Sequence, residues 1–313
     1  MSHWKYVAVA AGALALTCSS ISAATAAPAP AHRASTVAAS TKANALTAMH
    51  GEAFAYAKYT AFAGHAARTG KPAVAKLFQR TAGVELNDHF ADEAVIAGLV
   101  GSTEANLADA IAGETYEATT MYPAFAAQAT AEGCTVAAEL FTEIAADEAV
   151  HAAAYQTALN SLTDASVSVP APQVADVVTI VKSDPACAGA TQTNLLDAMH
   201  GESFAQAKYR LYAKQAAKTG KPAIAALFTG TAKVELREHF AGEAVLAGLV
   251  GTTKANLKTA ISGETYEATV MYPDFASQAK AAGDRAAAKE FRTAGRQEAS
   301  HARHFTAALR HLR

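Results

Sequence analysis

The chain repeats itself at a fixed interval of 150 residues. The string AMHGEAFAYAKY at 48–59 returns as AMHGESFAQAKY at 198–209, and HFADEAVIAGLVGSTEANL at 89–107 returns as HFAGEAVLAGLVGTTKANL at 239–257. Each copy is far longer than the about 20–50 residues of a solenoid repeat, and no insertion or deletion interrupts the register. We therefore expect two domains of one fold, over residues 41–162 and 191–313.

The segment between the two copies, residues 163–190, is predicted to be a linker. It contains SVSVPAPQ and SDPACAGA, in which proline, serine and glycine are frequent, and such residues favour extended or turning chain over helix. Cys134 and Cys187 flank most of this segment. In an oxidising compartment they could form a disulfide, and two free thiols are the alternative.

Each copy divides into four helical stretches. Alanine is abundant and 51% of the residues are hydrophobic, so intrinsic propensity favours helix nearly throughout. The strings TGKP, GLVGST and AEGC interrupt the first copy with the glycine and proline typical of helix ends. The predicted helices of that copy are residues 43–69, 72–99, 104–131 and 134–161. Long helices with short connections predict an all-α protein of two tandem antiparallel four-helix bundles.

The two copies carry net charges of opposite sign. Residues 45–162 hold 5 Lys and Arg against 14 Asp and Glu, a net charge of −9, whereas residues 194–313 hold 17 against 11, a net charge of +6. The halves should therefore attract one another. We expect one bundle per copy. The alternative is a swapped pseudo-dimer, in which the first two helices of one copy pair with the last two of the other.

The first 26 residues resemble a secretory signal peptide. Lys5 precedes an apolar run from Tyr6 to Thr17, and an Ala-x-Ala site ends at Ala26. The run is shorter than the about 20 residues of a membrane-spanning helix. We expect a secreted or cell-envelope protein, with an uncleaved anchor as the alternative. Nucleic acid is not an expected partner, because the chain does not interleave aromatic and basic residues.

Glutamates and histidines recur in register in both copies, whereas other charged positions differ freely, as at Lys76 and Ala226. They fall on all four predicted helices of each copy. In the first copy they are Glu52, Glu85, His89, Glu114, Glu117, Glu148 and His151, and in the second they are Glu202, Glu235, His239, Glu264, Glu267, Glu298 and His301.

Several carboxylates in a bundle core repel one another and lose hydration unless cations neutralise them. A carboxylate-rich site with one imidazole per metal suits iron, with manganese as the alternative, better than zinc. A glutamate from each of two helices, with Glu-x-x-His from the other two, is the ligand set of ferritin-like di-iron bundles. We therefore predict two dinuclear sites in ferritin-like bundles. The chain has no Cys-x-x-Cys, which excludes a rubredoxin-type site.

The strings GEAFAYAKY, PAVAKLF, NLADAIAGETYEATTMYPAFA and EAVHAAAY resemble the rubrerythrin family, and the likeness covers both copies. The resemblance implies di-iron centres in which Glu85 and Glu148 bridge the metals, and it implies the same roles for their second-copy partners. The terminal ligands it implies are Glu52, Glu114, Glu117 and His151.

For activity, the resemblance implies a peroxidase-type oxidoreductase that reduces hydrogen peroxide to water, with irons that cycle between the ferrous and ferric states. Dioxygen is the alternative substrate. The rubredoxin domain common in the family is missing, so the electrons would come from an unknown external donor. Two alternatives stay open, a non-catalytic protein that binds or sequesters iron and a helical envelope protein without metals.

Aromatic side chains near the predicted ligands have two interpretations. Tyr59, Tyr116 and Tyr122, with their second-copy partners, are either hydrogen-bond donors to the ligands or ordinary core residues. The remaining histidines are interpreted as solvated surface residues, and they are His50, His65, His200, His304 and His311.

The second helix of each copy departs from the family's pattern by one residue. The family has Glu-x-x-His there, whereas this chain has Glu85-Leu-Asn-Asp-His89 and Glu235-Leu-Arg-Glu-His239. A single added residue is most easily absorbed as a π-helical bulge. We predict such a bulge at 85–89 and 235–239, with both histidines facing the metals and favoured as ligands over Asp88 and Glu238.

Overall fold

The computed structural model describes residues 37–312, and these form helices joined by short turns and one long connection, with no strand among them. The first repeat contains α1 (Ala39–Arg68), α2 (Pro72–Val84), η1 (Glu85–His89), α3 (Phe90–Ala97), α4 (Thr103–Tyr116), η2 (Glu117–Met121), α5 (Tyr122–Ala131) and α6 (Thr135–Asn160). The second contains α7 (Gly189–Lys218), α8 (Pro222–Val234), η3 (Glu235–His239), α9 (Phe240–Leu246), α10 (Thr253–Tyr266), η4 (Glu267–Met271), α11 (Tyr272–Ala281) and α12 (Arg285–Arg310).

The all-α prediction is confirmed, and the observed helix bounds lie within a few residues of the predicted ones. The predicted signal peptide, residues 1–26, lies outside the described residues. Within residues 37–312, no helix has both the length and the apolar character needed to cross a membrane.

The helices start and end at the proline, glycine and serine residues expected at helix ends. Pro72 and Pro222 occupy the first turns of α2 and α8, where a missing backbone N–H costs nothing. Ser102 begins α4 by accepting a hydrogen bond from the Ala105 backbone N–H at 3.1 Å, which satisfies one of the free N–H groups at a helix start. The connection GLVGST therefore ends one helical pair and starts the next.

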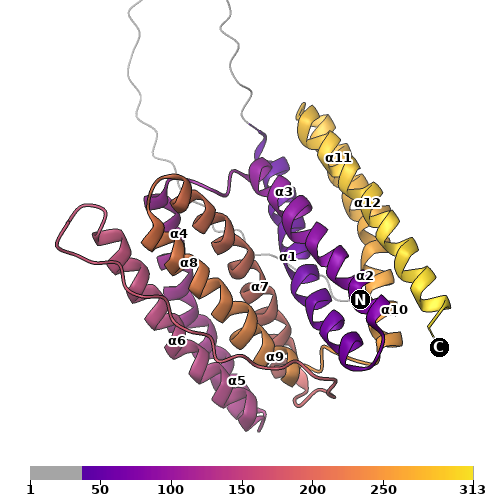
Figure 1. Ribbon diagram of the computed structural model, residues 1–313, viewed down its shortest axis with the longest axis horizontal. Coiled ribbons are helices and arrows are strands. Elements are labelled where there is room, and N and C mark those ends of the chain that lie inside the picture. The colour runs from indigo at the N-terminus through magenta and orange to yellow at the C-terminus, as the bar shows by residue number, and fades with distance from the viewer. Residues whose placement is uncertain (1–36, 313) are drawn as a thin grey trace, which may run out of the picture. The chain divides into compact units, whose positions relative to one another are not determined.

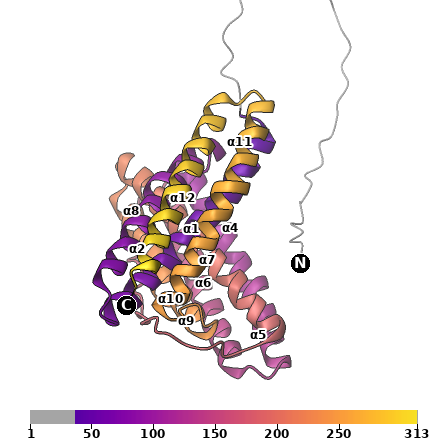
Figure 2. The ribbon, with the colours of Figure 1, turned by 90° about the vertical axis from the view of Figure 1, so that its right-hand side faces the viewer.

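Each four-helix bundle is built from both repeats. Helices α1 to α3 pack against α10 to α12 (bundle A), and α4 to α6 pack against α7 to α9 (bundle B), as the colours of Figure 1 and the rotated view of Figure 2 show. The Tyr59 hydroxyl donates to Glu264 at 2.5 Å, and His89 lies 2.6 Å from Glu298. The expectation of one bundle per repeat is therefore wrong, and the swapped alternative is the observed arrangement.

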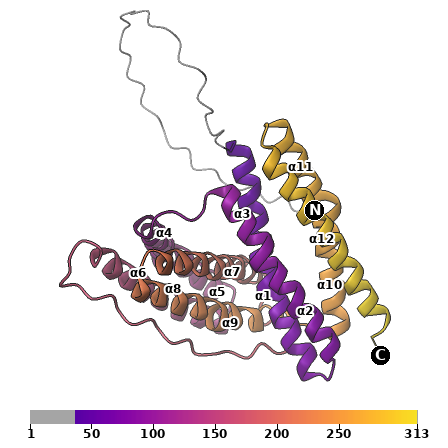
Figure 3. The ribbon, with the colours of Figure 1, turned by 45° about the horizontal axis from the view of Figure 1, so that its top comes forward.

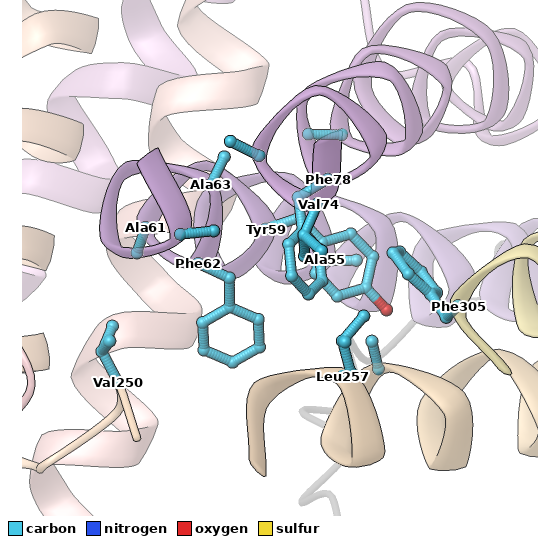
Figure 4. Packing of buried hydrophobic residues seen from close by; sticks show 14 residues of the cluster. Ala55, Tyr59, Ala61, Phe62, Ala63, Val74, Phe78, Val250, Leu257 and Phe305 are labelled. Carbon is cyan, nitrogen blue, oxygen red and sulfur yellow. The ribbon is translucent and has the colours of Figure 1, made fainter. Parts of the chain in front are cut away.

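Aromatic residues of both repeats fill the end of each bundle. Figure 4 shows Tyr59, Phe62 and Phe78 of α1 and α2 meeting Leu257 of α10 and Phe305 of α12. The ring centroids of Phe78 and Phe305 are 4.9 Å apart, and each ring is fully buried. Burial of a side chain of this size stabilises the fold by about 1.5–3 kcal/mol, so these contacts hold helix pairs from different repeats together.

The two bundles meet along α1 and α7, which lie side by side in Figure 3. The His50 ring stacks on Phe204 with centroids 4.0 Å apart, and His200 stacks on Phe54 at 3.9 Å. The interpretation of His50 and His200 as solvated residues is therefore wrong. It is also wrong for His65, which is buried.

The connection between the repeats, residues 163–188, is irregular and is fixed along bundle B, where Figure 1 shows it crossing α6, α8 and α9. We call it the strap. The Val178 N–H donates to the Arg237 carbonyl, and the Ala186 N–H donates to the Leu246 carbonyl, both at 2.8 Å. A disulfide joins Cys134 to Cys187, with Cα atoms 5.8 Å apart. The structure therefore has the disulfide and not the two free thiols. The irregular connection occupies 163–188 of the predicted linker, residues 163–190, because α7 already starts at residue 189.

Candidate metal centres

Each bundle holds a buried cluster of glutamates and histidines that comes from both repeats. Two overlapping groups make up the cluster of bundle A, Glu52, Glu85, His89 and Glu298 in one and Glu85, Glu264, Glu298 and His301 in the other. In each group the ligand atoms lie within 4.8 Å of one another. The groups share Glu85 and Glu298, which is the arrangement expected of two metals bridged by two carboxylates.

The distances in bundle A show how the shared glutamates divide their oxygens. His89 Nδ1 lies 2.6 Å from Glu298 Oε1 and 3.0 Å from Glu85 Oε2. His301 Nδ1 lies 2.9 Å from Glu298 Oε2 and 3.2 Å from Glu85 Oε1. Each shared carboxylate therefore presents one oxygen to each histidine.

Bundle B repeats this geometry with the roles of the repeats exchanged. Its two groups are Glu114, Glu148, His151 and Glu235, and Glu148, Glu202, Glu235 and His239. His239 Nδ1 lies 3.0 Å from Glu148 and 2.9 Å from Glu235, and His151 Nδ1 lies 2.9 Å and 3.3 Å from the same two glutamates. The shared pair is thus Glu148 with Glu235, which belong to different repeats.

Twelve of the fourteen predicted ligands lie in these four groups. The other two, Glu117 and Glu267, are half-buried and fall outside them. Glu117 Oε1 lies 3.6 Å from the position that a Cβ atom would take on Gly201. Glu267 Oε1 lies 3.6 Å from the corresponding position on Gly51. Both carboxylates therefore face the first helix of the other repeat, at the residue directly before Glu202 or Glu52. Their role as ligands stays a prediction.

The predicted bulges at 85–89 and 235–239 are confirmed, because η1 and η3 are π-helical turns with these bounds. The wider turn keeps a glutamate and a histidine four residues apart on the inner face. Both histidines are buried, whereas Asp88 is exposed and Glu238 is half-buried. Two further π-helical turns, η2 and η4, begin at Glu117 and Glu267 and were not predicted.

The buried charges fit a metal pair. Oxygens of Glu85, Glu114, Glu148, Glu235, Glu264 and Glu298 are buried without a hydrogen-bond partner. Burial, with the neighbouring Glu148 carboxylate, raises the pKa of Glu114 to about 8. Burial alone would lower the pKa of His301, but the carboxylates of Glu264, Glu298 and Glu85 raise it to about 12. Each cluster holds four glutamates against two histidines, so negative charge is left in the core at a cost, and divalent cations relieve that cost.

The profile of the rubrerythrin family matches residues 84–159, 105–181 and 231–309. A rubrerythrin of Porphyromonas gingivalis is 37% identical over 135 residues, which cover 39% of this chain and 67% of the relative. A nigerythrin of Nitratidesulfovibrio vulgaris is 37% identical over 136 residues, with 39% and 67% covered. This chain belongs to the rubrerythrin family. No solved structure matched the chain.

Family membership and the two clusters together support a di-iron centre in each bundle of this rubrerythrin. Of the alternatives in the sequence analysis, the helical protein without metals has no support here. A rubrerythrin of the same Nitratidesulfovibrio species is 34% identical over 136 residues, with 39% of this chain and 71% of the relative covered.

Tyrosines donate hydrogen bonds to the cluster glutamates across the repeat boundary. Tyr209 donates to Glu114 in bundle B as Tyr59 does to Glu264 in bundle A. Tyr122 likewise donates to Glu202, and Tyr272 to Glu52. The donor interpretation is therefore confirmed for these four. It is wrong for Tyr116, whose side chain is 55% exposed.

Two glutamates of the site were missed in the sequence, Glu93 and Glu243. Both are fully buried, and their carboxylates lie 2.5 Å from Tyr272 Oη and 3.0 Å from Tyr122 Oη. They recur at the 150-residue interval, which is the signal that could have found them. Because Tyr272 has a single hydroxyl proton and contacts both Glu52 and Glu93, one of the two carboxyl groups must itself carry a proton.

The Nε2 atoms of His89 and His239, which point away from the clusters, also have polar partners. His239 Nε2 lies 3.4 Å from Asp147 Oδ2, and His89 Nε2 lies 3.1 Å from Gln297 Oε1. Both partner atoms accept, so Nε2 donates, and Nδ1 is the nitrogen that faces the cluster and would supply its lone pair to a bound metal. Such partners orient a ligand histidine and raise its basicity. The partner is a carboxylate in bundle B and an amide in bundle A.

Proposed function

We propose that this member of the rubrerythrin family is an exported protein with two di-iron centres that reduces hydrogen peroxide with electrons from an external donor. The observation that carries the proposal is the pair of overlapping four-residue groups in each bundle, which share two glutamates. When bound, an iron pair would supply the two electrons that convert one peroxide and two protons into two waters.

The chain's own residues would position the centre and deliver protons. The Tyr272 hydroxyl connects Glu52 to Glu93 in bundle A, and the Tyr122 hydroxyl connects Glu202 to Glu243 in bundle B. Each tyrosine therefore holds a proton between a cluster carboxylate and a buried carboxyl group. Buried apolar side chains around the clusters exclude bulk water, which strengthens these contacts.

Export is supported by the leader pattern of residues 1–26 and by the disulfide between Cys134 and Cys187, because such bonds persist in oxidising compartments. The donor is proposed to be a separate reductant, since the chain contains no Cys-x-x-Cys for a rubredoxin-type site.

Iron analysis followed by rapid mixing tests the proposal. The purified protein should contain about four iron ions per chain, two per bundle, and peroxide should oxidise its ferrous form faster than dioxygen does. Glu148→Ala with Glu298→Ala is the control and should remove both centres. Iron at that stoichiometry without peroxide turnover would overturn the enzymatic proposal in favour of an iron-binding protein. A full iron complement in the double variant would overturn the centres themselves.

A further inference from the structure

The two clusters differ in what covers them. A cavity of about 420 Å³ lies against bundle A, and His301 of the cluster is one of its lining residues. The His301 side chain is 12% exposed, whereas that of its counterpart His151 in bundle B is 2% exposed. At the corresponding place of bundle B, the strap packs on α8 at Gly230 and contacts Asp147 of α6.

Contacts of the strap define this cover. Pro172 lies so close to Gly230 of α8 that a Cβ on that glycine would stand 2.1 Å from the Pro172 Cβ. Gln173 donates from Nε2 to Asp147 at 2.9 Å, and Asp147 in turn faces His239 of the cluster. A cavity of about 100 Å³ remains beside His239, and strap residues Asp176 and Val178 line it.

The sequences of the two repeats differ at the residues that meet the strap. Gly230 corresponds to Arg80, which is exposed and lines the cavity of bundle A. Ala154 corresponds to His304, which lines the same cavity. Gly230 thus stands where the strap packs on bundle B, and the large polar residues Arg80 and His304 stand at the cavity of bundle A, which no strap within residues 37–312 covers.

The burial of a matched valine pair follows the same division. Val234 lies one turn after Gly230 on α8 and is fully buried, whereas Val84 of α2 is half-buried and lines the cavity. Residues four apart share a helix face, so Val234 lies on the face that the strap covers.

We propose that the cavity beside His301 is the entry to the centre of bundle A, and that the strap is a fixed lid over the corresponding entry to bundle B. The inference rests on the proposed function in so far as the clusters hold metal. Metal ions, peroxide and a small reductant then reach bundle A directly, and they reach bundle B after the strap opens locally.

Release of iron to a chelator tests this division. Glu148→Ala should remove the centre of bundle B, so that only the centre of bundle A remains. Glu298→Ala should remove the centre of bundle A, so that only the centre of bundle B remains. With excess ferrous chelator, the rate of iron release from bundle B should be at least about tenfold lower than that from bundle A, because release from bundle B requires local opening of the strap. Equal rates would overturn the proposal.

Gly230→Arg tests whether the strap is the cause. The arginine places in bundle B the residue that bundle A has, and its Cβ would displace Pro172. Added to Glu298→Ala, it should raise the rate of iron release toward that of bundle A. Ala223→Arg, at an exposed position of the same helix, is the control and should change nothing. A folded Gly230→Arg variant with unchanged release would overturn the proposal.

Thiol labelling gives a readout that needs no metal, so it separates failure of this inference from failure of the proposed function. With Cys18 replaced by serine, a maleimide reagent should modify Val84→Cys quickly and Val234→Cys slowly. Gly230→Arg should accelerate labelling of Val234→Cys. Equal labelling of the two cysteines in the otherwise unchanged fold would contradict the lid, whether or not the protein binds iron.

Discussion

At the scale of single residues, the cluster depends on hydroxyl groups that the other repeat supplies. Tyr272 belongs to the second repeat, and it donates to Glu52 of the first and contacts Glu93. Its neighbour Tyr266 is 56% exposed. The two tyrosines are therefore a matched pair, one in contact with the cluster and one outside it.

Tyr272→Phe should weaken iron binding in bundle A. Loss of the hydroxyl leaves the Glu52 carboxylate without its donor, and removal of such an outer partner typically costs about 10–100-fold in metal affinity. Competition with a chelator of known affinity, in the Glu148→Ala background, measures the change. Tyr266→Phe should leave the affinity unaltered, and an equal loss in both variants would show that the hydrogen bond is not responsible.

The cluster residues could be singled out in the sequence because the two repeats act as an internal comparison. Glu85 and His89 are identical in the second copy, whereas two of the residues between them, Asn87 and Asp88, are replaced there by Arg237 and Glu238. Glu93 was overlooked because a single glutamate on a helix usually lies at the surface, and only the fold places Tyr272 against it. The stacking of His50 on Phe204 was equally hidden, because it joins helices from different bundles.

At the scale of elements, the π-helical turns η1 and η3 were predictable, whereas η2, η4 and the pairing of the helices were not. An extra residue between Glu85 and His89 has few ways to keep both side chains inside, so η1 followed from the register. The pairing had no such signal, since α1 and α7 present nearly the same apolar residues and glutamates. Either repeat can therefore complete the bundle of the other, and the route of the connection between residues 98 and 102 decides which one does.

The start of α7 shows how one carboxylate fixes an element. Glu132 accepts hydrogen bonds from the Thr191 side chain at 2.7 Å, from the Thr191 N–H at 2.8 Å and from the Ala190 N–H at 3.0 Å. These bonds satisfy free N–H groups at the helix start. The bonds from Thr191 lower the pKa of Glu132 from 4.5 to about 2.

Glu132→Gln should therefore lower thermal stability in a pH-dependent way. A carboxyl group whose pKa is lower in the folded state stabilises the fold above its unfolded pKa, and the effect is lost as pH falls through the folded value. The difference in Tm between the two proteins should be constant above about pH 5 and should shrink between pH 4.5 and pH 2. A difference that does not depend on pH would show that the charge of Glu132 makes no contribution.

At the scale of the whole molecule, the 150-residue repeat produces two buried clusters, and neither cluster belongs to one repeat. Glu85 pairs with Glu298 in bundle A, and Glu235 pairs with Glu148 in bundle B. The two repeats of one chain therefore exchange helices with each other, as two subunits do in a domain-swapped dimer. The opposite net charges of the repeats favour that association.

The most direct test of this account is the iron content of two double variants. Glu52→Ala with Glu298→Ala removes two residues of the same centre, so about two iron ions per chain should remain in bundle B. Glu52→Ala with Glu148→Ala removes two residues of the same repeat, and it should empty both centres. The reverse result, with iron lost from the first variant and half retained by the second, would contradict centres shared between the repeats.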